Sequence, residues 1–342
     1  MRIIQVLDAL DYGDGVCNDV IRKDALLKKM GYTSLIYSKW VHEKVRKYWN
    51  DIESLRVKPD DILIHHYSGV PHIMEYIKNQ RCKKVLVYHN VTPAEFLVSG
   101  NDAYKALEIL KENFELYDYF VGVSQFNAND LRKLGLKKEC DILPILLDFN
   151  ESDNSKIESE TTNFLFVGRI APNKKDEDII DIFNYYYKFI DANSNLYFVG
   201  NYDSKSNYYD ELQEKLKKLE CRSHIYFTGK VTDEELSVYY RKADIFICMS
   251  EHEGFCIPVL EGMHYNLPVI AYDACAIPET MGDAGILTYT KEPEVLAKLI
   301  YTILTTDKFK DILLKKQKER VITFSEDGIK TRLEFLIKKW RA

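Results

Sequence analysis

The sequence predicts an α/β protein made of two doubly wound domains, each a parallel β-sheet with helices on both faces. Short apolar runs alternate with amphipathic helical patterns along the chain, which is typical of βαβ units and therefore of parallel strands. The alternation is interrupted by the polar segment Asn150–Thr162 and then starts again. The 342 residues are also enough for two domains of ordinary size.

The first half of the chain opens with a strand pattern at Ile3–Asp8, a turn at Gly13-Asp14-Gly15 and an amphipathic helix over Val16–Met30. Ser124 is placed to cap a helix over Gln125–Leu134. The remaining strands of this half are predicted at Ser34–Tyr37, Ile62–His65, Val85–His89, Tyr119–Val123 and Ile142–Leu147.

The segment Asn150–Thr162 is interpreted as an interdomain linker, because Ile157 is its one large apolar residue. Thr232 then begins a capping-box pattern, and Gly328–Trp340 has the pattern of a basic amphipathic helix. The predicted domains are 1–150 and 160–325, followed by a terminal helix, 326–342, that could pack back on the first domain. The strands of the second half are predicted at Phe164–Val167, Leu196–Val199, His224–Thr228, Ile245–Met249, Val269–Ala271 and Ile286–Tyr289.

Composition narrows the function classes. The formal charge of −6 argues against a dedicated nucleic-acid binder, which would be strongly basic. There is no signal-peptide pattern and no apolar run of about 18 residues, so we expect a cytoplasmic protein. The seven cysteines form no C-x-x-C pair, so reduced thiols are expected rather than a metal cluster. The basic stretches Arg132–Lys138 and Lys338–Arg341 could contact the inner face of a membrane, but solvated helix ends are the simpler interpretation.

The first motif with chemical content is Ser250–Glu261, which follows the predicted strand Ile245–Met249. Pro258 is suited to the first position of a helix, so a glycine-containing turn leads into a helix N-terminus, which favours phosphate. Glu253 falls in the turn, and Glu261 falls in the first turn of the helix. One carboxylate could accept hydrogen bonds from ligand hydroxyls on one side of the bound phosphates, and the other from hydroxyls on the far side. The simpler interpretation is a solvated helix N-terminus, where acidic residues are common.

The second motif, Val167–Lys174, ends the first strand of the second half. Gly168 permits a sharp turn and Pro172 stiffens the loop. Arg169 and Lys174 could converge on one anion, and together they would neutralise a diphosphate. The alternative is a surface ion pair.

The spacing G-R-x-x-x-x-K followed by E-G-F-x-x-P-x-x-E resembles the retaining glycosyltransferases of family GT4. Their fold, GT-B, has two Rossmann-like domains facing each other across a cleft. The resemblance runs from about Phe164 to Leu287. In the first half it is thinner and rests on Gly13–Val16 and Tyr88–Pro93. Further matching segments are Phe227–Val231, Leu267–Ala271 and Ala276–Glu279.

The resemblance implies roles for the charged residues of the second domain. Arg169 and Lys174 would hold the donor diphosphate. Glu261 would bind the ribose hydroxyls, and Glu253 would bind those of the transferred sugar. Cys256 departs from the family pattern, in which many members have glycine, and could narrow the sugar pocket.

The resemblance also implies backbone contacts. Those of Gly254 and Phe255 would touch sugar and phosphate, and the segment from Gly229 to Val231 would line the base. From the first domain, Gly15 would close on the phosphates.

His89 would lie beside the transferred sugar. For this histidine the alternative is a strand-end residue that satisfies a backbone group. The stretch His65–Ser68 ends another strand of the first half and could line the acceptor site, but an ordinary loop is the simpler interpretation.

The implied function is transfer of a hexose, with retention of configuration, from a nucleotide-diphosphate sugar to a glycan or lipid-linked saccharide, in synthesis of cell-surface polysaccharide such as lipopolysaccharide. GDP-mannose and UDP-hexoses both remain open as donors. No cofactor beyond this co-substrate and no metal are expected, because the two cations and the helix N-terminus would stabilise the leaving diphosphate. Asp176-Glu177-Asp178 resembles a metal-binding D-x-D, but it is predicted to open a helix, where acidic residues complement the dipole.

Two other functions remain as alternatives. One is a non-catalytic subunit that binds sugar nucleotides. The other is an NAD(P)-dependent oxidoreductase, since Gly13-x-Gly15 follows the first strand. Asn18 stands where that motif requires its third glycine, and Tyr37-Ser38-Lys39 where it requires an acidic residue, which disfavours this second alternative.

Overall fold

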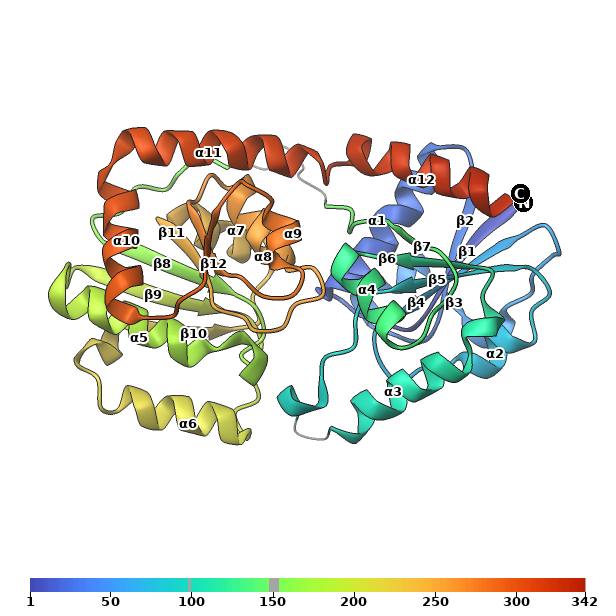
Figure 1. The fold of residues 1–342 in the computed structure, drawn as a ribbon, viewed down its shortest axis with the longest axis horizontal. Coiled ribbons are helices and arrows are strands. Elements are labelled where there is room, and N and C mark those ends of the chain that lie inside the picture. The colour runs from blue at the N-terminus through green and yellow to red at the C-terminus, as the bar shows by residue number, and fades with distance from the viewer. Residues whose placement is uncertain (98–99, 148–153, 342) are drawn as a thin grey trace. The chain divides into compact units, whose positions relative to one another are not determined.

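The computed structural model describes residues 1–97, 100–147 and 154–341 of the chain (Figure 1). It divides the chain into two compact units. The first unit takes residues 1–148 together with 323–342, and the second takes residues 149–322. Of the predicted linker, residues 150–153 lie outside the described residues.

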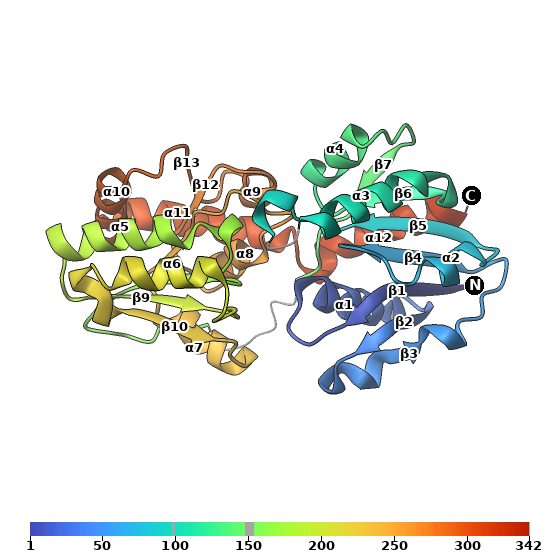
Figure 2. The same ribbon diagram turned by 90° about the horizontal axis from the view of Figure 1, so that it is seen from below.

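The first unit is a parallel sheet with helices against it (Figures 1 and 2). Its strands are β1 (Arg2–Leu10), β2 (Thr33–Val41), β3 (Trp49–Asp51), β4 (Ile62–Tyr67), β5 (Lys83–Tyr88), β6 (Tyr119–Gly122) and β7 (Cys140–Ile142). Its helices are α1 (Gly15–Lys29), α2 (Met74–Lys78), α3 (Asn101–Glu112), α4 (Gln125–Lys133) and α12 (Glu326–Arg341).

The strand order in this sheet is β3-β2-β1-β4-β5-β6-β7, and neighbouring strands pair in parallel. The order reverses between β1 and β4, as in a doubly wound sheet. Successive side chains of β1 point to opposite faces of the sheet. Val6 packs in a cluster with Ile77 of α2, and Leu7 packs in a cluster with Val20 of α1. The helices therefore cover both faces, as predicted.

The predicted strand at Ile142–Leu147 is wrong in its bounds. Strand β7 pairs with β6 over Cys140–Ile142. One more bond follows, from the amide of Leu143 to the carbonyl of Gly122 at 3.0 Å. Pro144 then has no N–H to donate, so the ladder cannot continue. The apolar residues after it are buried without being part of the strand.

Helix α12 belongs to the first unit although it is distant in sequence from the rest of it (Figure 1). The Lys339 ammonium lies 2.9 Å from carboxylate oxygens of both Glu139 and Asp141. The hydroxyl of Tyr119 donates to the carbonyl of Lys339 at 3.1 Å, and Trp340 is fully buried. Part of the basic terminal stretch thus holds the helix in place. Within the described ranges, none of the helices is both long and apolar enough to cross a membrane.

The second unit is again a parallel sheet between helices. Its strands are β8 (Thr162–Val167), β9 (Ser194–Val199), β10 (Ile225–Gly229), β11 (Ile245–Cys248), β12 (Val269–Tyr272) and β13 (Ile286–Thr288). Its helices are α5 (Asp176–Phe189), α6 (Asn207–Leu216), α7 (Asp233–Lys242), α8 (Ile257–His264), α9 (Ile277–Met281), α10 (Pro293–Thr305) and α11 (Asp307–Ile322), with a 3-10 turn η5 (Pro172–Lys174) before α5.

The strand order of the second sheet is β10-β9-β8-β11-β12-β13, with parallel pairings. The order reverses between β8 and β11, and ligands of doubly wound sheets bind at the carboxyl ends of strands beside such a reversal. The prediction of two doubly wound parallel-sheet domains is confirmed.

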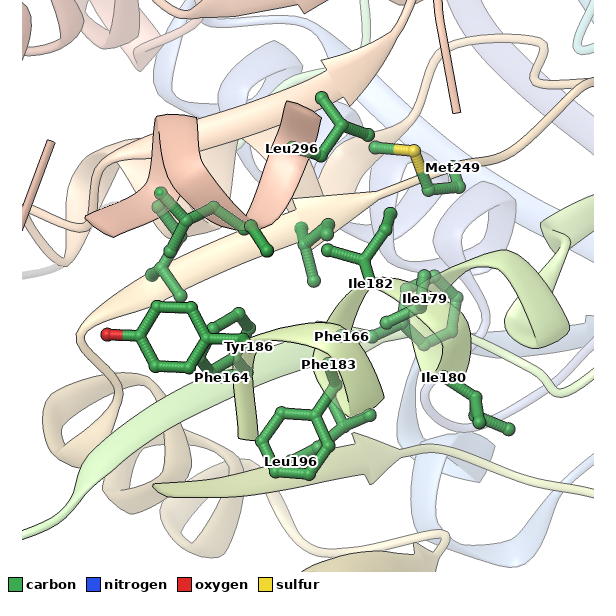
Figure 3. Close-up of a cluster of buried hydrophobic side chains, with 14 of the residues drawn as sticks. Phe164, Phe166, Ile179, Ile180, Ile182, Phe183, Tyr186, Leu196, Met249 and Leu296 are labelled. Atoms are coloured by element: carbon green, nitrogen blue, oxygen red, sulfur yellow. The ribbon is translucent and has the colours of Figure 1, made fainter. Parts of the chain in front are cut away.

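The core of the second unit fixes β8 against α5 (Figure 3). The ring of Phe164 in β8 lies 5.3 Å from that of Phe183 and 4.9 Å from that of Tyr186, both in α5. Met249, at the end of β11, and Leu296 of α10 belong to the same cluster. Because β8 and α5 are both anchored here, the loop between them, which carries Arg169 and Lys174, has fixed ends.

The described part of the predicted linker is held on the second unit. The amide of Ile157 donates to the carbonyl of Arg241 at 2.9 Å, and the Lys156 ammonium lies 2.6 Å from the carboxylate of Asp244. The chain from residue 154 onward is therefore bound along α7 before β8 begins.

Candidate active site

The loops that follow β8 and β11 are joined at the reversal point of the second sheet. The amide of Glu251 donates to the carbonyl of Asn173 at 2.8 Å, and the side-chain amide of Asn173 donates to the carbonyl of His252 at 3.1 Å. The two motifs that the sequence singled out are thus neighbours in space.

Lys174 and Glu253 form an ion pair between these loops, with 2.6 Å between Nζ and Oε1. Their side chains keep only 18% and 12% of their exposure. Burial by itself would lower the pKa of Lys174, but attraction to Glu253 outweighs it, and the pKa of Lys174 is raised. The site therefore holds a permanent buried ammonium next to a carboxylate.

Backbone conformation directs Lys174 inward. Turn η5 contains Pro172, and Lys175 has a φ of +56°, in the left-handed region, before α5 begins. The ammonium of Lys175 consequently turns to other acids and lies 3.4 Å from Glu251 and 3.6 Å from Glu177. Two adjacent lysines thus have different partners.

The acidic triplet opens α5 as predicted, and each of its members has protein partners. Asp178 lies 2.7 Å from the Lys291 ammonium, which also contacts Glu251 at 2.7 Å. The carboxyl group of Asp176 is fully buried, and burial raises its pKa to about 8. It accepts a bond from the amide of Ala171 at 3.2 Å and thereby holds the loop that follows β8.

The turn after β11 reaches α8 through a left-handed residue. Cys256 has a φ of +68° and caps α8, which explains why glycine suits this position. Pro258 is the second residue of α8 rather than the predicted first. Glu261 is correspondingly its fifth residue, one position beyond the first turn where it was predicted.

Glu261 is half-buried and already engaged. Its Oε2 accepts a hydrogen bond from the hydroxyl of Tyr240 at 2.8 Å. Tyr240 in turn stacks on Tyr265, with 5.0 Å between ring centroids and 4° between planes. This aromatic pair orients the carboxylate in advance of any ligand.

Glycines bring the ends of three strands together at the same sheet edge. The amide of Gly168 donates to the carbonyl of Val199 at 3.0 Å, and that of Gly200 donates to the carbonyl of Gly229 at 3.1 Å. A Cβ on Gly200 would lie 2.1 Å from the carbonyl oxygen of Gly168, so no larger residue fits there. Gly229 ends β10, which lies two places from β8 in the sheet, and the half-buried Val231 follows it in the loop.

The remaining predicted residues of the second unit differ in exposure. Arg169 is exposed, and within residues 1–97, 100–147 and 154–341 it has no hydrogen bond or ion pair. Gly254 is half-buried, and Phe255 is buried with its carbonyl accepting a bond from the hydroxyl of Thr280. The structure thus brings Lys174 and Glu253 together and leaves the Arg169 guanidinium free to meet an anion.

In the first unit, Gly15 is the first residue of α1, directly after its capping residue Asp14. His89 follows β5 and is buried. Its Nε2 lies 2.9 Å from Nδ1 of His66, whose Nε2 lies 3.1 Å from Oε1 of Gln5. Sequence reasoning missed Gln5 and the role of His66. The available signal was a glutamine inside the apolar run of the first strand.

Among the residues that the structure describes, two side-chain groups have the donor types and spacing of a metal site. One ligand atom from each of Asp19, His66 and His89 lies within 4.8 Å of the others, and the same holds for Cys248, Glu253 and Cys256. In both groups a lysine ammonium already binds the carboxylate: Lys23 lies 2.7 Å from Asp19, as Lys174 lies 2.6 Å from Glu253. In each group, a lysine ammonium therefore already neutralises the negative charge of the carboxylate.

Two doubly wound parallel sheets, one with a cation and carboxylates at its reversal point, place the chain in the class of α/β proteins with two Rossmann-like domains. Comparison with known families agrees with this class. Residues 148–320, about half of the chain, match the family model described as glycosyl transferases group 1, and the chain belongs to this family. The predicted resemblance is confirmed at the level of the family.

Curated relatives match over parts of their length. The O-antigen chain mannosyltransferase B of Escherichia coli is 30% identical over 107 residues, which are 31% of this chain and 28% of that protein. An uncharacterized glycosyltransferase of Methanocaldococcus jannaschii is 23% identical over 267 residues, which are 77% of this chain and 61% of that protein. The chain therefore spans less than two thirds of the length of either relative.

A solved structure supports the fold along the whole chain. The Anabaena protein HepE, determined in complex with UDP and glucose, superposes with a TM-score of 0.78 at 16% identity and covers 99% of this chain and 100% of its own. The likeness identifies the GT-B fold, as predicted.

Proposed function

We propose that this glycosyltransferase-family chain transfers a hexose from a nucleotide-diphosphate sugar to a saccharide acceptor, with retention of configuration and without a metal ion. The observation that carries the proposal is the buried ion pair between Lys174 and Glu253 at the reversal point of the second sheet. A cation suited to phosphate and an acceptor suited to sugar hydroxyls are held side by side there.

Each part of the donor has a suitable group in this unit. The Lys174 ammonium and the N-terminus of α8 would bind the diphosphate. Glu253, released from Lys174, would accept hydrogen bonds from the transferred sugar. Glu261, oriented by Tyr240, would accept those of the ribose. The exposed Arg169 would complete the neutralisation of the diphosphate.

These groups also supply the chemistry. Breaking the bond from the sugar to the diphosphate leaves negative charge on the leaving phosphate. Lys174, Arg169 and the α8 N-terminus would stabilise that charge, and loss of one such preorganised group costs about 3–4 kcal/mol of barrier. The leaving phosphate itself would accept the proton of the attacking hydroxyl.

The names of the similar proteins indicate which donors and acceptors to test first. The E. coli relative is a mannosyltransferase of O-antigen chains, and HepE was determined with UDP and glucose. GDP-mannose and UDP-hexoses are therefore the donors to test first, with a glycan or lipid-linked saccharide of cell-surface polysaccharide synthesis as the acceptor.

The test begins with a thermal-shift panel of nucleoside diphosphates and their sugars. A ligand present at 100 times its Kd adds about 2.7 kcal/mol of stability, which such an assay detects readily. The donor that gives the largest shift is then supplied radiolabelled, and release or transfer of the sugar is followed over time. A shift without any turnover would favour a non-catalytic binding subunit, and no shift with any sugar nucleotide would refute the proposal.

A further inference from the structure

Two buried thiols and a carboxylate lie together in the connection from β11 to α8. Cys248 is the last residue of β11, Glu253 lies in the turn that follows, and Cys256 caps α8. The chain folds back between the two cysteines, which are eight positions apart, so that their Sγ atoms lie 3.9 Å from each other. Both thiols are buried. The proposed function gives a task to Glu253 alone.

The spacing of the two sulfurs fits a tetrahedral metal centre. Thiolate sulfur binds Zn²⁺ at about 2.3 Å, so two thiolates on one tetrahedral ion lie about 3.8 Å apart. The sulfurs of Cys248 and Cys256 already have nearly this separation, and an oxygen of Glu253 lies within 4.8 Å of both. Zinc sites also accept carboxylate oxygen, and those with an open position use three protein ligands. The three side chains thus have the donor types, number and spacing of an open zinc site.

Glu253 still has an oxygen to offer a cation. Its Oε1 lies 2.6 Å from the Lys174 ammonium, whereas its Oε2 has no hydrogen bond or ion pair in the parts of the chain that the structure describes. The other candidate group differs in this respect. There Lys23 occupies one oxygen of Asp19, and the amide of Leu146 occupies the other. Of the two groups, the one after β11 therefore retains an anionic ligand for a metal ion.

The turn that carries the three ligands is held in shape. The carbonyl of Glu253 accepts the amide of Ala276 at 3.2 Å, and the hydroxyl of Ser250 lies 3.2 Å from the sulfur of Cys248. Cys256 has a φ of +68°, which is unfavourable for any residue except glycine. Strained residues of this kind persist mostly at ligand sites. A sulfur atom kept at such a position indicates a use for the sulfur.

We infer that Cys248, Glu253 and Cys256 form an inhibitory site for a thiophilic divalent cation such as Zn²⁺, with water as the fourth ligand. Both thiols give up their protons when the metal binds. The bound cation takes over the Glu253 carboxylate and repels the Lys174 ammonium. Metal and nucleotide-diphosphate sugar then exclude each other. This effect on the donor rests on the proposed function, whereas the binding of the metal does not.

Metal binding is testable in the intact, reduced chain without any donor. Co²⁺ serves as the probe, because thiolate ligands give it a charge-transfer absorption in the near ultraviolet and tetrahedral geometry gives it strong visible bands. We expect one equivalent of Co²⁺ to produce both and Zn²⁺ to displace it. Cys248→Ala and Cys256→Gly should each halve the near-ultraviolet absorption and weaken Zn²⁺ binding by more than about tenfold. Because Cys256→Gly suits the backbone at its position, it decides the outcome if Cys248→Ala does not fold.

Lys174→Ala distinguishes a metal site from general damage to the turn. Without the competing ammonium on Glu253, this variant should bind Zn²⁺ about tenfold more tightly than the wild type. A variant that merely disturbed the turn would bind the metal more weakly. Weaker binding of Zn²⁺ by Lys174→Ala would therefore overturn the inference.

Cys275→Ala is the matched control, since Cys275 is a second thiol near the same turn. Its Sγ lies 3.4 Å from the carbonyl of Glu251 and 3.6 Å from Nδ1 of His252. This variant should bind Co²⁺ and Zn²⁺ as the wild type does. Absorption that survives in Cys248→Ala and disappears in Cys275→Ala would assign the metal to another thiol and overturn the inference.

The thermal shift tests the inhibition. For the sugar nucleotide with the largest shift, an equivalent of Zn²⁺ bound to the protein should remove that shift in the wild type and leave it intact in Cys248→Ala. Absence of the cobalt absorption, or Zn²⁺ affinity unchanged in both cysteine variants, would overturn the site. Metal binding as expected with an undiminished donor shift would overturn the inhibition alone. If no sugar nucleotide shifts the wild type, the proposed function fails, and the metal titrations still decide the site.

Discussion

Replacing Lys174 by alanine separates the structural and ligand-binding roles of its ion pair. The change leaves the Glu253 carboxylate buried without its cation. Removing one partner of a buried pair costs about 3–5 kcal/mol, and the 18% and 12% exposure of these side chains favours the lower end, about 3 kcal/mol. For a unit of this size that corresponds to a fall in Tm of roughly 6–12 °C.

The same variant should also lose its response to ligand. In the wild type, a nucleotide-diphosphate sugar at 100 times its Kd should raise Tm by about 5–11 °C. Without the ammonium at the reversal point, both the nucleoside diphosphate and its sugar should give little shift. Differential scanning fluorimetry over a ligand titration measures both effects in one plate.

Glu253→Gln supplies the complementary result. The amide keeps a hydrogen-bond acceptor for Lys174, so the variant should be only about 1 kcal/mol less stable. It should keep the shift with nucleoside diphosphate and lose the additional shift that the sugar brings.

Lys215→Ala is the matched control for these variants. Lys215 lies 2.6 Å from Asp181 in the same unit, but the two side chains are 30% and 42% exposed. It should cost at most about 1 kcal/mol and leave the ligand response intact. A full ligand shift in Lys174→Ala, with the Lys215→Ala control behaving as expected, would refute the assignment of the donor site.

The remaining predictions concern single residues of the second unit. Glu261→Ala should abolish most of the thermal shift that any nucleoside diphosphate causes, as measured by fluorimetry. Tyr240→Phe should weaken nucleotide binding by about 1 kcal/mol, because the Glu261 carboxylate loses the hydroxyl that orients it. Burial raises the pKa of the Asp176 carboxyl from 3.8 to about 8. As pH rises from about 4 to 8, the unfolded chain loses this proton while the folded chain keeps it, so the free energy of unfolding falls. Asp176→Asn should remove that fall, which is as much as about 1.4 kcal/mol per pH unit and is measurable by urea unfolding at pH 5 and pH 8. Cys256→Gly should change stability by less than about 1 kcal/mol, because φ at this residue is +68°, whereas Cys256→Val should cost at least about 2 kcal/mol by urea unfolding.

Each of these single-residue predictions would be contradicted by a specific result. An undiminished ligand shift in Glu261→Ala would remove the carboxylate from the donor site. An unchanged slope of stability against pH in Asp176→Asn would mean that the buried carboxyl is ionised at neutral pH. Equal stability of Cys256→Val and wild type would show that the backbone at this position tolerates a branched side chain.

The loops of the second unit could be predicted because their signals are local. A glycine or a proline at a strand end, followed by charged residues and a helical pattern, predicts where a loop lies and what it offers. The exact start of α8 could not be predicted. It depends on Cys256 adopting a left-handed conformation that its residue type disfavours. Pro258 and Glu261 were therefore each assigned one position too early in the helix.

The row of Gln5, His66 and His89 could not be predicted, because it depends on pairing between strands far apart in sequence. His66 lies opposite Val87 in the register of β4 and β5, and Gln5 opposite Ile64 in that of β1 and β4. Nothing local to any one strand encodes these two registers. The ion pair of Lys174 with Glu253 similarly joins residues 79 positions apart.

The place of α12 has a consequence for synthesis of the chain. Residues 149–322 belong to the second compact unit and are translated before α12. The unit made first stays unfinished, because the apolar face that takes up Leu333, Leu336 and Trp340 is covered only when the last helix has been translated. Premature termination near residue 322 would therefore leave this apolar face of the first unit uncovered.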